Sequence, residues 1–148
     1  MKFLEKIIGF FQKAKPSIEV TSKNNEELLR KQEILTSEIL FDVCRALDSN
    51  MVYNKTKDGK VFTEIKRPRA TMFPNGGQHT IVIQRPEDMH LNGSGIVYQI
   101  DIYLQNEASG LHLHEGPYGA DINMPVSEIK DFRKMIFNKV QNCSKFPQ

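Results

Sequence analysis

The chain has 148 residues, of which 39% are hydrophobic and 26% charged, and its formal net charge is +2. A chain of this length fits one domain that buries about 70% of its unfolded surface, so the composition excludes wholesale disorder. Basic and acidic segments alternate along the sequence, which excludes the single dominant basic face of a dedicated nucleic-acid binder. No apolar run reaches the roughly 20 residues that a transmembrane helix needs, and we expect no such segment.

The first fifteen residues predict an amphipathic helix with one strongly apolar face. Phe3, Leu4, Ile7, Ile8, Phe10, Phe11 and Ala14 make up this face. Four lysines and one glutamate give the segment a net charge of +3. The face needs a cover, which is the domain's own core, another chain or a lipid surface. We favour contact with a protein partner or a second copy, and we keep a peripheral membrane contact through residues 1–15 open.

Residues 16–24 are predicted to form a linker, because Pro16 stops a helix and the following residues are mostly polar. Asn24 and Glu27 have the spacing of a capping box, which places the start of a long helix at residue 25. The helix is expected to run to about Leu47 and to bury a stripe that includes Ile39 and Val43. Residues 25–148 are then predicted to form a single α+β domain.

From residue 51 to residue 124 the apolar residues recur with a period of two, which predicts strands. The predicted strands are 51–56, 60–67, 79–85, 96–104, 111–115 and 120–124. The first two flank Lys57, Asp58 and Gly59 and are expected to form a hairpin. In the strand 96–104, Ile100 and its alternate neighbours are expected to face the core, whereas Gln99 and Asp101 face water.

A second core helix, which Ser127 can cap, is predicted to close the chain. Its inward stripe is expected to consist of Ile129, Phe132, Ile136 and Val140. The fold class is therefore α+β. We expect a single antiparallel β-meander of about five to six strands, packed on one face by two helices. The N-terminal amphipathic helix is an addition to this domain.

Basic residues gather between positions 53 and 73, where aromatic residues are interleaved with them. The residues of this possible nucleic-acid surface are Tyr53, Lys55, Lys57, Lys60, Lys66, Arg67 and Arg69. Cationic side chains and aromatic platforms on a sheet are the ingredients of a single-stranded nucleic-acid site. We favour the simpler interpretation, in which lysines protect the edge of a hairpin from aggregation.

His112 and His114 are two positions apart on a predicted strand, so both imidazoles point to one side and could reach one metal ion. A carboxylate at a suitable spacing and a further histidine are missing from the pattern. The simpler interpretation is that both histidines lie on the exposed side of an edge strand. No nucleophile elbow and no phosphate-binding glycine loop are present, so the sequence predicts no catalytic residue and no cofactor.

These observations favour a non-enzymatic protein-binding function, as an adaptor or an immunity-like inhibitor that acts through its sheet face or its N-terminal helix. Small adaptors and inhibitors of bacteria and mobile elements have this size, which is an analogy only. The alternatives are a single-stranded nucleic-acid binder using residues 53–73 and, least favoured, a metal-dependent enzyme using His112 and His114. Cys44 and Cys143 are isolated, which is typical of reduced thiols and predicts a cytoplasmic protein.

Overall fold

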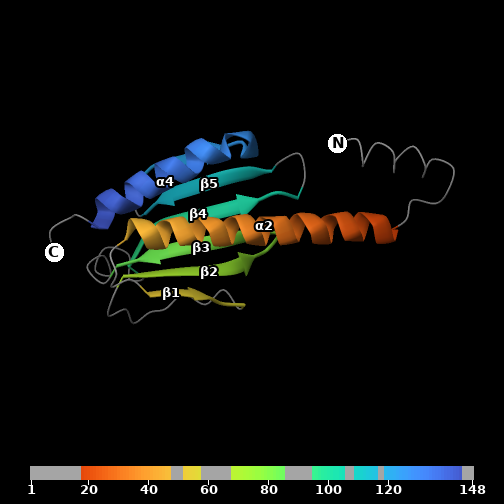
Figure 1. Ribbon diagram of the computed structural model, residues 1–148, viewed down its shortest axis with the longest axis horizontal. Helices are drawn as coiled ribbons and strands as arrows, with labels where there is room; N and C mark the ends of the chain where they lie inside the picture. Colours follow the sequence, from red (N-terminus) through yellow and green to blue (C-terminus); the bar gives the residue numbers. More distant parts are fainter. Residues whose placement is uncertain are drawn as a thin grey trace.

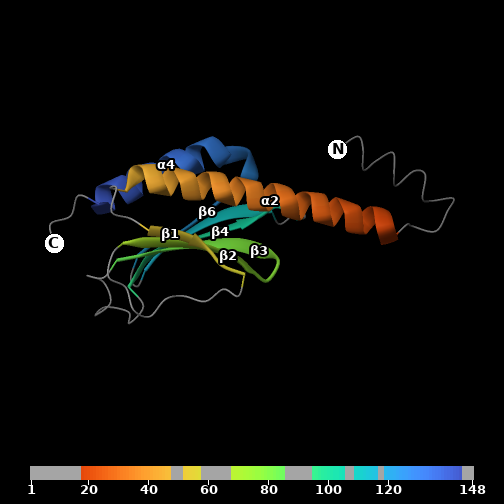
Figure 2. The ribbon, with the colours of Figure 1, turned by 60° about the horizontal axis from the view of Figure 1, so that its bottom comes forward.

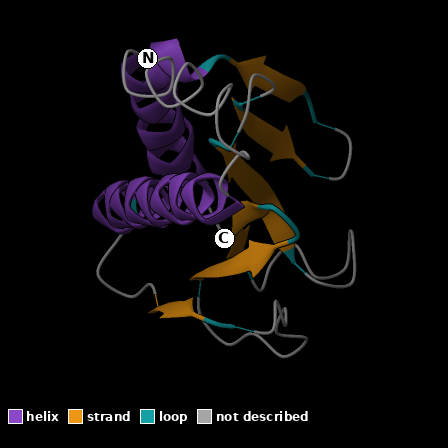
Figure 3. Cartoon of the chain, turned by 90° about the vertical axis from the view of Figure 1, so that its right-hand side faces the viewer, coloured by secondary structure: helices purple, strands orange, loops and turns teal. Residues whose placement is uncertain are grey.

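The chain folds as an α+β domain in which two helices cover one face of a sheet, as the sequence predicts. The computed structural model describes residues 18–47, 52–57, 68–85, 95–105, 109–116 and 119–144. Both helices lie on the same side of the strands (Figures 1 and 2), and the end-on view shows this layering most directly (Figure 3). The predicted N-terminal helix of residues 1–15 lies outside the described residues.

The first described element is helix α2, Ile18–Ala46, which has 29 residues. It begins seven residues before the predicted start at residue 25, so the linker prediction is wrong for residues 18–24 and Asn24 does not cap the helix. Nothing between 18 and 24 is glycine or proline, and the capping-box spacing occurs here inside a helix. The N-terminal part of α2 extends past the sheet (Figure 1), and the first buried residue among its described side chains is Gln32.

The sheet has six strands in the order β1-β2-β3-β4-β5-β6. Their bounds are Val52–Lys55, Arg69–Asn75, Gln78–Gln84, Ile96–Tyr103, Gly110–Glu115 and Asp121–Met124. Strands β2 to β6 pair antiparallel in chain order, which confirms the predicted meander. Strand β1 instead pairs parallel with β2, with Val52 opposite Arg69.

Strand β2 is the one described strand that the alternation did not predict. Its buried run from Ala70 to Phe73 lies between Pro68 and Pro74, and prolines near a short run lower its apparent strand propensity. Residues 60–67, the predicted hairpin partner of β1, lie outside the described residues. The β2–β3 turn holds Gly76 at a φ of 67°, a conformation in which glycine avoids the Cβ clash of other residues.

The hydrophobic core lies between the helices and the sheet. Helix α4, Ile129–Ser144, follows a short 3₁₀ turn, Val126–Glu128, and Ser127, the predicted cap, lies within that turn. Ile39 and Val43 of α2 and Phe132 and Ile136 of α4 meet Ile81, Ile83, Ile100, Ile102, Leu111 and Leu113 of the sheet. All of these side chains are at most 1% exposed. The predicted inward stripes of both helices and of the strand 96–104 are therefore confirmed.

The opposite face of the sheet differs from the expectation at its centre. Thr71, Thr80 and Val82 are buried there, and Asp101, which was predicted to face water, is only 7% exposed. Toward β5 and β6 this face becomes polar and partly exposed. The alternation of apolar and polar residues thus located the helix-facing side but not the exposure of the other side.

Gln32 is a buried polar residue that joins α2 to β3, to the β2–β3 turn and to the residue after β4. Its side-chain nitrogen lies 2.8 Å from Nδ1 of His79 and its oxygen accepts the backbone N–H of Leu104 at 2.9 Å. Burial lowers the pKa of His79, which favours a neutral imidazole that accepts from the amide. These bonds fix α2 over the β2–β3 turn and the end of β4.

Candidate functional site

The predicted partner-binding residues of the N-terminal segment, Phe3, Leu4, Ile7, Ile8, Phe10 and Phe11, lie outside the described residues. The apolar surface that the structure does describe is on α2. The large hydrophobic side chains that are exposed among the described residues are Leu29, Ile34 and Phe41. Ile34 is 54% exposed and Phe41 is 64% exposed.

Ile34 and Phe41 lie on the side of α2 that faces away from the sheet. They are seven residues apart, so in a regular α-helix their directions differ by only about 20°. Ile39 and Val43, which are buried in the core, project from the other side of the helix. The two exposed residues therefore form an apolar stripe along the outer surface of α2.

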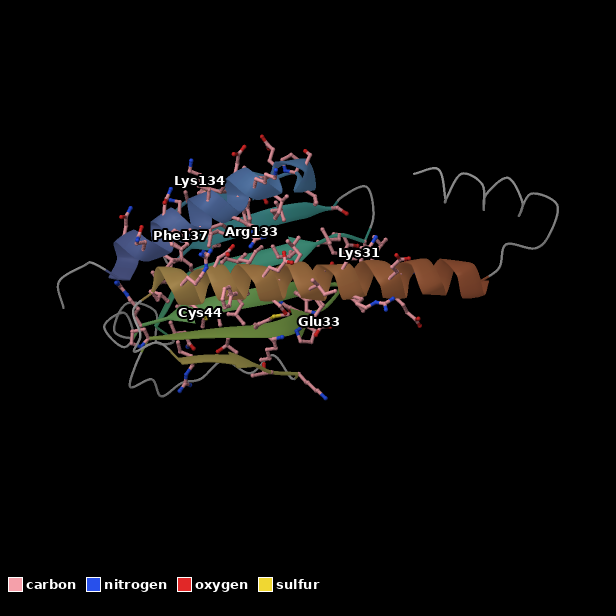
Figure 4. The ribbon with its side chains drawn as sticks, in the orientation of Figure 1. Lys31, Glu33, Cys44, Arg133, Lys134 and Phe137 are labelled. Carbon is pink, nitrogen blue, oxygen red and sulfur yellow. The ribbon has the colours of Figure 1, made fainter. Side chains whose placement is uncertain are left out.

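The outer surface of α4 continues this stripe. We call the combined surface the outer helical face, and it consists of Ile34, Phe41 and Arg45 on α2 and Arg133, Lys134 and Phe137 on α4. Figure 4 shows Arg133 and Phe137 on the side of α4 that faces α2. The guanidinium of Arg45 lies 5.7 Å from the ring centre of Phe41 and 5.5 Å from that of Phe137, so it joins the two aromatic rings by cation–π contacts.

A buried carboxylate fixes the cations of this face. Arg133 donates from Nε to Oδ2 of Asp42 at 2.7 Å and from Nη2 to Oδ1 at 3.1 Å, and Arg45 donates to the same Oδ1 at 3.1 Å. Burial alone would raise the pKa of Asp42, but the hydrogen bonds from Arg133 and Arg45 outweigh it and hold the pKa below its ordinary value. Asp42 is therefore ionised, and both of its oxygens are occupied.

Two shallow grooves run along the outer helical face. The first has a volume of about 440 Å³ and is lined by Glu33, Ile34, Ser37, Glu38, Phe41, Lys55 and Arg133. The second has a volume of about 380 Å³ and is lined by Asp42, Arg45, Arg133, Lys134 and Phe137. Arg133 separates the two grooves and also donates to Glu38 at 3.2 Å. The arrangement offers apolar side chains in the middle and charged groups at both ends.

The basic residues between 53 and 73 are only partly described. Lys55 and Lys57 are exposed at the end of β1, and Arg69 is half-buried on β2. The side chains of Tyr53, Lys60, Lys66 and Arg67 lie outside the described part of the chain. Phe73 is 7% exposed and so cannot offer its ring to a nucleobase, which removes one aromatic platform from the nucleic-acid hypothesis.

The structure places His112 and His114 side by side on the sheet face opposite the helices, in a row of hydrogen-bonded groups. Thr80 donates to Oδ1 of Asp101 at 2.6 Å, and Oδ2 of Asp101 lies 3.0 Å from Nδ1 of His112. Asp121 Oδ1 is 3.0 Å from Nε2 of His112 and 2.6 Å from Nδ1 of His114. We call this set the histidine–aspartate row, and it crosses β3, β4, β5 and β6.

The row favours a protonated His112. Burial lowers the pKa of His112, but hydrogen bonds and charge from Asp101 and Asp121 outweigh it and raise the pKa above the ordinary value. Two carboxylate partners require two N–H donors, and only the imidazolium has both. Among the described residues, no group of three or more histidine, cysteine, aspartate or glutamate side chains is arranged to hold a metal ion.

Sequence reasoning missed Ile34, Phe41 and Phe137 because it looked for the stripe that fills the core. The signal was present as an apolar pair one heptad apart on the side of α2 opposite Ile39 and Val43. No protein-family model matches the chain, and the searches of curated proteins and of solved structures found no match either. In the described part of the chain, neither helix combines the length and the apolar character needed to cross a bilayer.

Proposed function

We propose that this chain is a protein-binding module, an adaptor or inhibitor, whose contact surface is the outer helical face. The observation that carries the proposal is the exposure of Ile34 and Phe41 one heptad apart on α2. Large side chains at this spacing match the anchor positions of a partner helix, and aromatic and arginine residues are enriched at the centres of protein interfaces. The adjoining grooves provide concave surface on both sides of Arg133.

The surface of the sheet opposite the helices supports this choice. Where that surface is exposed, toward β5 and β6, it carries His112, His114, Asp121 and Asn123, which are polar. An apolar contact surface of the kind that stabilises a lasting complex is described only on the outer helical face. A cytoplasmic location is part of the proposal, because the isolated Cys44 and Cys143 are typical of reduced thiols.

The test is a native mass measurement on the protein purified from its own host, made with three chains. The wild type is expected to carry a second polypeptide. Phe41→Asp is expected to lose it without unfolding, because substitution of an exposed side chain changes stability by only about 0.5 kcal/mol. Leu29→Asp is the matched control, since Leu29 is also exposed on α2 but lines neither groove.

We expect the Leu29→Asp chain to keep the second polypeptide. A wild-type chain that is found alone in every preparation contradicts the proposal. Equal retention of the partner by Phe41→Asp and by the wild type would also contradict it, because the contact would then lie elsewhere.

A further inference from the structure

The charges around the apolar stripe are distributed unevenly along α2. Near Ile34 the first groove contains two carboxylates, Glu33 and Glu38, and two cations, Lys55 and Arg133, so it is balanced. Beyond Phe41 the second groove contains three cations and one carboxylate, a net charge of +2. The outer helical face is therefore neutral at one end and basic at the other.

The carboxylate in the basic groove, that of Asp42, is not available to a binding partner. The side chain of Asp42 is only 7% exposed, and both of its oxygens accept hydrogen bonds from Arg133 and Arg45. Lys134 is exposed on α4 at the rim of the same groove. Among the described residues, no carboxylate forms an ion pair with Lys134. The groove thus presents Lys134 and the outer side of Arg45 to whatever binds there.

We infer that the partner presents an amphipathic helix with acidic residues at one end of its apolar stripe. Its apolar side chains pack on Ile34 and Phe41, and its carboxylates lie against Arg45 and Lys134. This inference rests on the proposed function and adds the chemistry of the partner. Complementary charge at the rim of an apolar contact sets the register and the rate of association more than the affinity.

Charge argues against the chain's own first fifteen residues as the occupant. Their apolar face would suit the stripe, but four lysines and one glutamate make the segment basic. Binding would place those lysines beside the basic groove, where like charges oppose the contact.

Charge also argues against a second copy of the chain. In a two-fold antiparallel contact that sets Ile34 against the Phe41 of the other copy, residues whose numbers sum to 75 lie opposite each other. Arg45 would then face Arg30 of the second copy, twice in the same interface. Like charges in such positions disfavour that arrangement.

The test uses the full chain and two synthetic helical peptides of equal length. Both peptides carry the same leucine stripe; one carries glutamates at one end of the stripe, and the other carries lysines at that same end. Fluorescence anisotropy of labelled peptide measures each affinity. We expect the glutamate peptide to bind about three- to tenfold more tightly at low salt, as surface ion pairs allow, and the preference to fall as salt rises.

Lys134→Glu is expected to abolish the preference for the glutamate peptide. Lys130→Glu is the matched control, because Lys130 is exposed on the same helix but lines neither groove, and it is expected to keep most of the preference. Circular dichroism verifies that both variants fold.

Equal binding of the two peptides contradicts the inference about the partner's charge. The proposed protein-binding function is tested separately, by the native mass measurement. Binding of neither peptide, or a native complex that consists of two copies of this chain, overturns the inference. Loss of the partner in Phe41→Asp together with equal peptide binding would show that the surface is correct and the stated partner chemistry is wrong.

Discussion

Asp42→Asn is predicted to destabilise the domain by weakening the ion pair between Asp42 of α2 and Arg133 of α4. The carboxylate accepts three hydrogen bonds from two guanidinium groups, and an amide at this position would turn one acceptor into a donor that faces a donor. Removing one partner of a buried ion pair costs about 3–5 kcal/mol. Because the side chains of Arg133 and Arg45 are 34% and 57% exposed and can be rehydrated, we expect about 2–3 kcal/mol.

The assay is urea unfolding followed by circular dichroism, supported by a thermal melt in which the midpoint falls by about 4–12 °C. The pKa of Asp42 in the folded chain lies below its unfolded value, so its stabilisation is complete above about pH 4 and is lost as the pH falls through the folded value. The difference between wild type and Asp42→Asn should therefore shrink in acid.

Asp131→Asn is the matched control for this prediction. Asp131 is exposed in the first turn of α4, where its charge interacts with the helix dipole, and its loss should cost about 0.3–1 kcal/mol. An Asp42→Asn variant as stable as the control, or a difference from wild type that is unchanged at pH 3, would refute the reasoning.

Three further perturbations test the fold and the histidine–aspartate row. Ile100→Asp should cost several kcal/mol, because it places an unpaired charge in the core. Gln99→Asp should cost less but should not be neutral, because its new carboxylate lies beside that of Asp101. Equal thermal midpoints of the two variants would contradict the strand assignment. Because the pKa of His112 is raised in the folded chain, its stabilisation is full below the unfolded pKa and is lost as the pH rises through the folded pKa. The free energy of unfolding of the wild type should therefore exceed that of His112→Gln by more at pH 5.5 than at pH 9. A difference in urea melts that does not change with pH would contradict this prediction. Deletion of residues 1–15 should leave the melting temperature nearly unchanged, because the buried core on α2 begins at Gln32, and a strongly lowered midpoint would show that the segment packs on its own domain.

The elements that the sequence predicted best have a regular apolar period. Alternation in the strand 96–104 placed Ile100 and Ile102 in the core, and the spacing of Phe132 and Ile136 did the same for α4. These patterns depend on local geometry, which a single segment specifies completely. Strand β2 was missed although it forms a local antiparallel hairpin with β3, because the prolines on either side of its buried run hide it.

The candidate surfaces were less predictable because they depend on register between distant segments. Asp101 and His112 are partners because β4 and β5 pair with these two residues opposite each other, and no local sequence pattern predicts that register. Arg133 reaches Asp42 across 91 positions of sequence. Phe41 could have been recognised from its place opposite the core stripe, but its exposure depends on whether another element covers it.

The most direct test of the central claim is site-specific photocrosslinking from the outer helical face. A photoreactive phenylalanine analogue replaces Phe41 in one chain and Asn123, on the polar face of the sheet, in another. We predict that position 41 captures a helical segment of a second polypeptide and that position 123 captures none. Capture at position 123 with none at position 41 would contradict the claim that the outer helical face binds the partner.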